Sequence, residues 1–416
     1  MKSFTIPTFY KSSVIGQIKE TRRKQDRLKK DFTPTFLDFG PVQIYIARHF
    51  GFCYGVENAV EIAYKTLDEN PTKRVFLLSE MIHNPLVNKD LLDRGIQFLM
   101  DTSGKQLIPW ETLTKEDVVI VPAFGTTLEI EQTLSKIGIN PYAYNTTCPF
   151  VEKVWNRAGQ IGERGYTIIV HGKPNHEETR ATFSHSQSNA PTLVVKDMAQ
   201  TKLLADYLLG ERTEDQFFED FKGQFSDGFQ PATHLQRIGV VNQTTMLASD
   251  TQAISDFLKQ TLMQKHQLDD KQIEPYFANT RDTLCYATND NQEATAGLLE
   301  KEADLAVVIG GYNSSNTAHL VELCEEKLPT FYIESADCLL PNNQINHFNL
   351  HTGTSSITTP FIPFQNTENP VKILLTCGAS CPDSMVESVL HGILSYFDTV
   401  RPVEEVIQAI HSENER

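Results

Sequence analysis

Short runs of β-branched and aliphatic residues recur along the chain, and each is followed by a polar or glycine-containing loop and then by a helical pattern. This alternation is typical of α/β units with mainly parallel sheets. The strands that it predicts are residues 42–46, 75–78, 118–121, 167–170, 238–241, 305–309 and 373–375. A first helix is predicted after residue 53, because apolar residues repeat there on one face at helical spacing. They are Val56, Ala59, Val60, Ala63 and Leu67.

Polar residues gather directly after several of these strands. The groups are His83-Asn84, His176-Glu177-Glu178, Asn242-Gln243-Thr244-Thr245, Asn313-Ser314-Ser315-Asn316 and Gly378-Ala379-Ser380. Open α/β sheets bind ligands outside the carboxyl ends of their strands. The pattern therefore predicts that these loops contribute to a ligand site.

Three cysteines, Cys53, Cys148 and Cys285, each stand in a loop just before a helical pattern. A helix N-terminus carries partial positive charge and lowers the pKa of a nearby thiol, which favours the thiolate that metals require. Three such thiolates can converge on one inorganic centre and leave one metal position open for a substrate. The alternative is that each cysteine is a small buried hydrophobe, because no C-x-x-C spacing supports a shared site.

The acidic motif after the strand at residues 167–170 has two interpretations. It begins like the zincin sequence H-E-x-x-H, but Arg180 stands where the second histidine belongs, which argues against a zinc protease. His176 and Glu178 could instead bind a phosphate and supply a proton. The alternative is an exposed helix start, where acids interact favourably with the helix dipole.

The Ser- and Asn-rich loops are similarly ambiguous. Hydroxyls, amides and free backbone N–H groups at a helix start can form an anion site, as in Ser314, Ser315 and Asn316. The same residues can simply cap a helix. Thr244 and Ser380 stand in loops with the same two interpretations. No Walker A or G-x-G-x-x-G sequence is present, so nucleotide binding lacks its usual signals.

Composition describes an ordinary globular protein of 416 residues, 40% hydrophobic and 22% charged, long enough for two to four domains. The net charge of −16 argues against nonspecific nucleic-acid binding. Residues 1–40 carry a net charge of +5, and the remaining residues carry a net charge of −21. The basic run at 19–30 predicts a solvated helix. The more specific interpretations are that this run binds an acidic partner or acts as a targeting segment.

Other features place the chain in a reducing compartment. No secretory signal and no apolar run of transmembrane length is found in the sequence. Seven cysteines without paired spacing argue against a disulfide framework. Residues 213–231 and 341–370 are polar stretches and are predicted to be insertions or loops.

Taken together and in this order, the motifs resemble those of the 4-hydroxy-3-methylbut-2-enyl diphosphate (HMBPP) reductases, the last enzymes of the methylerythritol phosphate route to isoprenoids. The resemblance runs from about residue 42 to residue 395. It includes GFCYGVENAV, IHNPLVNKDLLDRG, TTCPFVEKVW, HEETRAT, NQTTM, CYATNDNQEA, NSSN and GASCPD. The N-terminal extension and the segment DGFQPATHLQRIGVVNQTTM resemble the plastid-type branch of the family.

The resemblance implies a trefoil of three α/β domains, with mainly parallel sheets, around a central iron–sulfur cluster. The domains expected are 42–148, 149–282 and 283–397, with a basic extension at 1–41 and a tail at 398–416. It implies one 4Fe–4S cluster per chain, with Cys53, Cys148 and Cys285 as ligands. The fourth iron would bind the substrate hydroxyl.

The resemblance also implies roles for polar residues. Glu178 would be the proton donor, and Thr244 would position the substrate hydroxyl and a water. The diphosphate would be contacted by His83, His176, Ser314, Ser315, Asn316 and Ser380. Two electrons, from a donor such as ferredoxin or flavodoxin, and two protons would remove the hydroxyl as water. The products would be isopentenyl and dimethylallyl diphosphates, formed in the cytoplasm, or in the plastid stroma of a plant or alga.

Two departures from the family pattern bear on the site. Phe124 stands where many bacterial members have histidine, and activity with one fewer imidazole is expected. Cys377 and Cys381 flank Gly378-Ala379-Ser380 and are expected to be inert, as are Cys324 and Cys338.

The alternative functions are a cluster-dependent hydratase or dehydratase, and a structural metal or redox-sensing protein. Neither nucleic acid nor membrane is expected as a partner.

Overall fold

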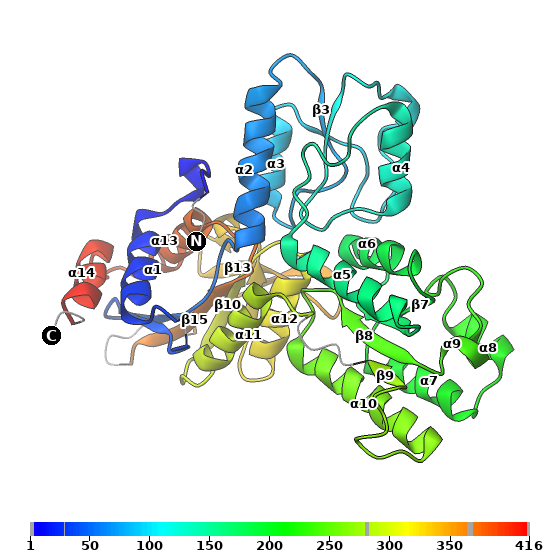
Figure 1. Ribbon diagram of the computed structural model, residues 1–416. Coiled ribbons are helices and arrows are strands. Elements are labelled where there is room, and N and C mark those ends of the chain that lie inside the picture. Colours follow the sequence, from blue (N-terminus) through cyan, green and yellow to red (C-terminus); the bar gives the residue numbers. More distant parts are fainter. Residues whose placement is uncertain (1–3, 29, 279–282, 364–368, 414–416) are drawn as a thin grey trace. The chain divides into compact units, whose positions relative to one another are not determined.

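The computed structural model describes residues 4–28, 30–278, 283–363 and 369–413, and it shows an α/β protein with three sheets (Figure 1). All seven predicted strands are present, and the first helix is α2 (Tyr54–Glu69). The chain divides into two compact units. Unit 1 comprises Met1–Glu57, His83–Lys89 and Tyr286–Arg416, and unit 2 comprises Asn58–Ile82 and Asp90–Cys285.

Unit 1 is built on an eight-stranded sheet. Its centre consists of four parallel strands in the order β2 (Val42–Ile46), β15 (Val371–Cys377), β10 (Leu305–Ile309) and β11 (Thr330–Ile333). Antiparallel strands flank this centre: β1 (Thr35–Asp38), β13 (Gln344–Asn349), β12 (Leu339–Leu340) and β14 (Thr354–Thr358). The central strands are parallel because helices connect them and cover both sheet faces, which buries nearly every side chain of β10 and β15.

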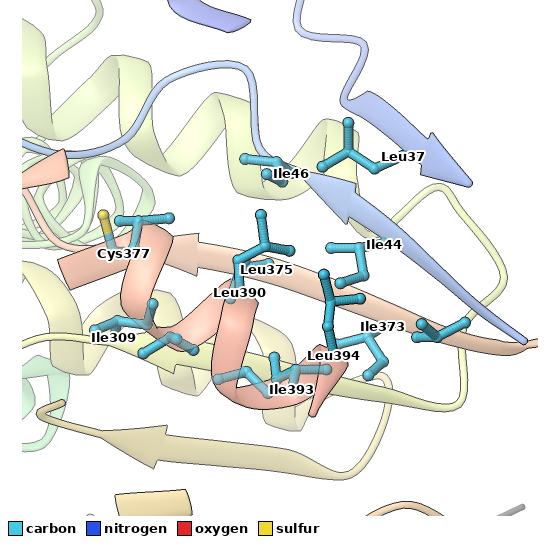
Figure 2. Packing of buried hydrophobic residues seen from close by; sticks show 14 of the residues in the cluster. Leu37, Ile44, Ile46, Ile309, Ile373, Leu375, Cys377, Leu390, Ile393 and Leu394 are labelled. Atoms are coloured by element: carbon cyan, nitrogen blue, oxygen red, sulfur yellow. The ribbon is translucent and has the colours of Figure 1, made fainter. Parts of the chain in front are cut away.

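Alternate side chains of the central strands point to opposite faces, and a different set of helices covers each face. One face packs against α1 (Ser13–Gln25), α13 (Asp383–Leu394) and α14 (Val403–Glu413). Figure 2 shows Leu390, Ile393 and Leu394 of α13 over the strand residues Ile373 and Leu375. The other face packs against α11 (Tyr286–Leu298) and α12 (Ser315–Glu325). Two 3-10 turns complete the unit, η1 (Thr8–Tyr10) and η3 (Ala336–Cys338).

Unit 2 holds two parallel sheets. The three-stranded sheet has the order β4 (Gln97–Phe98), β3 (Val75–Leu77), β5 (Val118–Ile120). The four-stranded sheet has the order β7 (Thr192–Val195), β6 (Thr167–His171), β8 (Ile238–Asn242), β9 (Phe277–Ala278). The helices beside them are α3 (Pro85–Asp93), whose first residues belong to unit 1, α4 (Leu128–Ile137), α5 (Pro149–Glu163), α6 (Glu177–Gln187), α7 (Met198–Leu209), α8 (Glu214–Asp220), α9 (Pro231–His234), α10 (Ala248–His266) and the 3-10 turn η2 (Trp110–Thr112).

Three segments differ from their sequence predictions. The basic run at 19–30 is helical only as far as Gln25, where α1 ends, and it is not fully solvated, because Thr21 is buried. Residues 341–370 contain the hairpin of β13 and β14 rather than only a loop. Residues 213–231 contain α8, whose Phe217 is fully buried. In the second case the strands are mostly half-buried or exposed and have no apolar face. In the third case the polar residues around Phe217 masked the buried face of α8 in the sequence.

The predicted domain boundaries stay a prediction. In the structure, β2 pairs with β15, so residues 42–46 share a sheet with residues far along the chain. This long-range pairing places the start of the predicted first domain in unit 1, together with most of the predicted third domain. No helix in the described ranges of the chain combines the length and apolar character needed to cross a bilayer.

Replacing Phe217 by alanine is expected to destabilise unit 2 strongly. Its ring packs with Phe221, Phe225 and Phe229, at a centroid distance of 5.5 Å from Phe229. Removing a fully buried aromatic side chain costs about 3–5 kcal/mol of unfolding free energy. Urea denaturation followed by circular dichroism measures the change. The control is Tyr142→Ala, where the side chain is exposed and the expected loss is below about 1 kcal/mol.

Candidate functional site

In unit 1, polar residues gather where the adjacent parallel strands β10 and β15 end, and they are called the unit 1 polar cluster below. Ile309 and Cys377 are partners in the register, and Gly310 and Gly378 follow them. The Ser380 hydroxyl donates to the backbone carbonyl of His83 at 3.0 Å. This bond ties the loop after β15 to the loop that carries the buried His83. The structure therefore brings together two predicted site residues that are nearly 300 positions apart in the sequence.

The N-terminus of α12 belongs to the same polar cluster. Ser314 is the N-cap, and its hydroxyl oxygen accepts from the Thr317 N–H at 3.2 Å. The Asn316 carboxamide oxygen accepts from the Ala379 N–H at 2.8 Å, and within the described chain its buried amide nitrogen has no hydrogen-bond partner. Ser315 is buried beside it. Buried donors at a helix N-terminus suit an anion, because each needs an acceptor and the helix dipole favours negative charge.

Substituting alanine for Gly378 is expected to weaken binding of a diphosphate. A Cβ atom there would lie 2.0 Å from the Thr317 hydroxyl oxygen, so Thr317, and with it the Ser314 cap, must move. We expect the dissociation constant for pyrophosphate, measured by calorimetry, to rise about tenfold, which corresponds to about 1.4 kcal/mol. The control is Gly16→Ala in α1, where a Cβ meets no atom within 4 Å. Equal affinity in Gly378→Ala would remove the unit 1 polar cluster from diphosphate binding.

Unit 2 contains a second cluster of polar residues, at the ends of the adjacent strands β6 and β8. His176 is the N-cap of α6, and its Nδ1 accepts from the Glu178 N–H at 3.1 Å. Because an accepting imidazole nitrogen carries no proton, the neutral ring is fixed with its proton on Nε2. The ring of Phe124 meets this imidazole edge-to-face, with centroids 5.6 Å apart. Phe124 therefore supports the imidazole sterically and adds no second ligand-binding nitrogen.

Glu178 lies in the first turn of α6 and is 1% exposed. Its carboxylate accepts from the backbone N–H of Thr244, which fixes it against the loop after β8. The adjacent Gln243 holds this loop, since its carboxamide oxygen accepts from the Lys173 N–H at 3.1 Å and from the Thr179 hydroxyl at 3.0 Å. Glu178 and Thr244 are thus adjacent.

The three cysteines all stand at helix starts, as predicted. Cys148 is the N-cap of α5, and its N–H donates to the Ala123 carbonyl at 2.9 Å. Cys53 immediately precedes α2, and its N–H donates to the Ala379 carbonyl at 3.2 Å, next to Ser380. Cys285 precedes α11 and is buried. Cys53 belongs to unit 1, whereas Cys148 and Cys285 belong to unit 2. Among the described residues, no group of three His, Cys, Asp or Glu side chains could hold a metal ion.

Residues of the N-terminal extension surround the Cys53 loop, which the sequence gave no reason to expect. The Phe4 ring meets Tyr54 at 4.9 Å, and the Tyr10 ring meets Phe52 at 5.7 Å. Lys19 lies over Phe50, with its Nζ 4.6 Å from the ring centroid, and pairs with Asp383 at 2.6 Å. The extension therefore contacts the residues on both sides of Cys53. No periodic signal marks such contacts, because they join single side chains across long sequence distances.

The other four cysteines are buried. Burial raises the pKa of the Cys324 thiol to about 12 and raises that of Cys381 well above its ordinary value. A thiol that stays protonated is neither a nucleophile nor a metal ligand. This supports the expectation that Cys381, next to Ser380, is inert.

An α/β chain with polar side chains and unsatisfied donors gathered at strand ends has the architecture of an enzyme that acts on an anionic substrate. Residues 44–394 match the model of the LytB protein family. The chain belongs to this family of iron–sulfur enzymes, as the sequence motifs predicted.

Two curated relatives, both from cyanobacteria, have the same name. The chain is 38% identical over 392 residues to the 4-hydroxy-3-methylbut-2-enyl diphosphate reductase of Cyanothece sp., covering 94% of this chain and 90% of the relative. It is 40% identical over 358 residues to the enzyme of the same name from Synechococcus sp., covering 86% of each. These cyanobacterial relatives agree with the predicted plastid-type branch.

Solved structures agree on the α/β fold. A structure described as (E)-4-hydroxy-3-methyl-but-2-enyl diphosphate reductase, the terminal enzyme of the non-mevalonate pathway, is 26% identical with a TM-score of 0.50, covering 85% of this chain and 99% of that one. The E-1-hydroxy-2-methyl-but-2-enyl-4-diphosphate reductase from Plasmodium falciparum is 20% identical with a TM-score of 0.60, covering 90% of this chain and 99% of that one.

Proposed function

We propose that the chain is an HMBPP reductase, an oxidoreductase that removes the substrate hydroxyl as water and forms isopentenyl and dimethylallyl diphosphates. This is the last step of the methylerythritol phosphate pathway. The observation that carries the proposal is the family match over residues 44–394, which includes every residue given a role below. The family favours this reaction over the hydratase and structural-metal alternatives.

One 4Fe–4S cluster per chain is the proposed cofactor, with Cys53, Cys148 and Cys285 as ligands. The donor set fits it, because each is a thiol at a helix start, where the thiolate is favoured. When bound, the cluster supplies electrons one at a time and an open, Lewis-acidic iron.

The diphosphate is held by neutral donors rather than by a P-loop. Six side chains do this in our proposal: His83, His176, Ser314, Ser315, Asn316 and Ser380. Support comes from the buried Asn316 amide, which lacks an acceptor among the described residues, and from the His176 tautomer, which carries its proton on Nε2. Held in this way, the diphosphate end of the substrate fixes where its hydroxyl lies.

Glu178 donates the proton that turns the departing hydroxyl into water. Its burial and its bond to the Thr244 N–H hold the carboxyl group in place. The Thr244 hydroxyl positions the substrate hydroxyl and a water. General acid catalysis by a positioned carboxyl group contributes about 10²–10⁴-fold to the rate. The reaction consumes two electrons and two protons in total.

The electron donor in our proposal is a protein such as ferredoxin or flavodoxin. The reducing compartment is the cytoplasm, or the plastid stroma if the source is a plant or alga.

The test is anaerobic purification with iron and sulfide assays, followed by HMBPP turnover with reduced methyl viologen. We expect a cluster, consumption of reductant and formation of both five-carbon diphosphates. A cluster with water addition or loss, and no consumption of reductant, would favour the hydratase alternative. Zinc, or no metal after anaerobic reconstitution, would favour the structural one.

A further inference from the structure

The basic N-terminal extension has no role in the proposed reaction, yet it borders a cavity beside Cys53. The cavity has a volume of about 200 Å³. Its lining includes Phe4, Phe52, Cys53, Tyr54, Tyr286 and Asn291. Phe4 comes from the extension. Two further residues of the extension contact the lining: Tyr10 contacts Phe52, and Lys19 contacts Phe50. The extension therefore shapes this cavity.

The lining has the composition of a protein interface. Tyr286 is 38% exposed, and aromatic side chains of this kind carry much of the binding energy where proteins dock. Asn291 is 4% exposed, and within the described chain its amide nitrogen has no hydrogen-bond partner. The cavity thus offers an apolar wall and a buried donor, and its size suits one side chain or the edge of one group.

Charge indicates which partner fits. Inside the cavity, Glu57 and Asp290 are the acids, and Glu57 interacts with Lys11 and Lys19 of the extension. Outside it, Lys11, Arg23 and Lys24 are exposed. Residues 1–40 carry +5, whereas the rest of the chain carries −21. An acidic protein is therefore repelled by most of this molecule and attracted to the extension.

We propose that the Cys53 cavity and the exposed cations Lys11, Arg23 and Lys24 of the extension form the docking surface for an acidic electron-carrier protein. The proposal rests on the proposed function, because that reaction needs two electrons from outside the chain. Cys53 itself lines the cavity, so a carrier docked there lies against a cluster ligand. No covalent step is involved: the carrier is oxidised by one electron at each of two encounters.

The test compares two reductants on the cluster-loaded enzyme. The variant Lys11→Glu/Arg23→Glu reverses two exposed charges of the extension. Its matched control, Lys202→Glu/Lys222→Glu, makes the same charge change at exposed positions of unit 2. Turnover is measured with reduced plant-type ferredoxin, as the acidic probe, and with reduced methyl viologen. A third variant, Phe4→Glu, puts an acid into the cavity wall.

Both extension variants are expected to raise the KM for ferredoxin at least tenfold and to leave the viologen-driven rate and the iron content unchanged. The ferredoxin-driven rate of Lys11→Glu/Arg23→Glu should also fall less steeply with salt. The control should match the wild-type chain in both assays. An unchanged ferredoxin KM, or an equal loss in the control, overturns the docking surface. So does a loss of viologen-driven rate that matches the ferredoxin loss, since that marks a structural role. Absence of wild-type turnover with viologen would contradict the proposed function instead.

Discussion

The substitution Glu178→Gln is expected to reduce HMBPP turnover by at least about 100-fold, because a carboxamide cannot act as the general acid. Glutamine has nearly the same shape, and its carbonyl oxygen can still accept from the Thr244 N–H. The loop after β8 should therefore stay in place. Iron and sulfide content and the dissociation constant for HMBPP should match the wild-type chain. Viologen oxidation gives the rate, and calorimetry under anaerobic conditions gives the affinity.

The neighbouring residue supplies the control for this prediction. Glu177 is also buried in the first turn of α6, but its carboxylate accepts from the Ser79 hydroxyl and has no place in the proposed chemistry. Glu177→Gln should keep turnover within a few-fold of the wild-type rate. If Glu178→Gln turned over normally, Glu178 would not be the proton donor. If Glu178→Gln lost the cluster, its effect would be structural, and this variant would not test the role of Glu178 as proton donor.

Much of the fold could be predicted because the central strands are buried on both faces. Runs such as residues 305–309 are apolar throughout, and β10 has those bounds in the structure. The strands β10 and β15 are parallel neighbours, so both end at the same edge of the sheet. The placement of the loops that follow them is a consequence of this pairing. That is why Ser380 and Asn316 could be expected near one another before any contact between their loops was known.

The remainder depends on contacts that leave no periodic pattern. In the hairpin, β14 is mostly exposed and β13 is mostly half-buried, so the two strands lack an apolar face that a sequence could reveal. The tautomer of His176 depends on a single backbone N–H, and the support of Phe52 depends on Tyr10, 42 positions earlier. Neither is encoded in local spacing. Motif matching predicted residues that bind and react, but not the residues that hold them.

Cys53→Ser is expected to lower the iron and sulfide content to a small fraction of the wild-type value and to abolish turnover. A serine hydroxyl has a much higher pKa than a thiol, so it is a poor ligand for an iron–sulfur cluster. The local fold should survive, because the backbone N–H that donates to the Ala379 carbonyl is unchanged. Iron and sulfide assays after anaerobic reconstitution, with the absorbance of the cluster, measure the loss without reference to activity.

Cys324→Ala separates this effect from the loss of any thiol. Cys324 is fully buried in the core of unit 1, and burial holds its pKa near 12, so it has no thiolate to offer. This control should keep a full cluster and lose only about 1 kcal/mol of stability, the cost of a small buried group. A full cluster in Cys53→Ser would remove Cys53 from the ligand set. It would also remove the reason for an electron carrier to dock at the neighbouring cavity, so the ligand assignment and the docking surface depend on this one measurement.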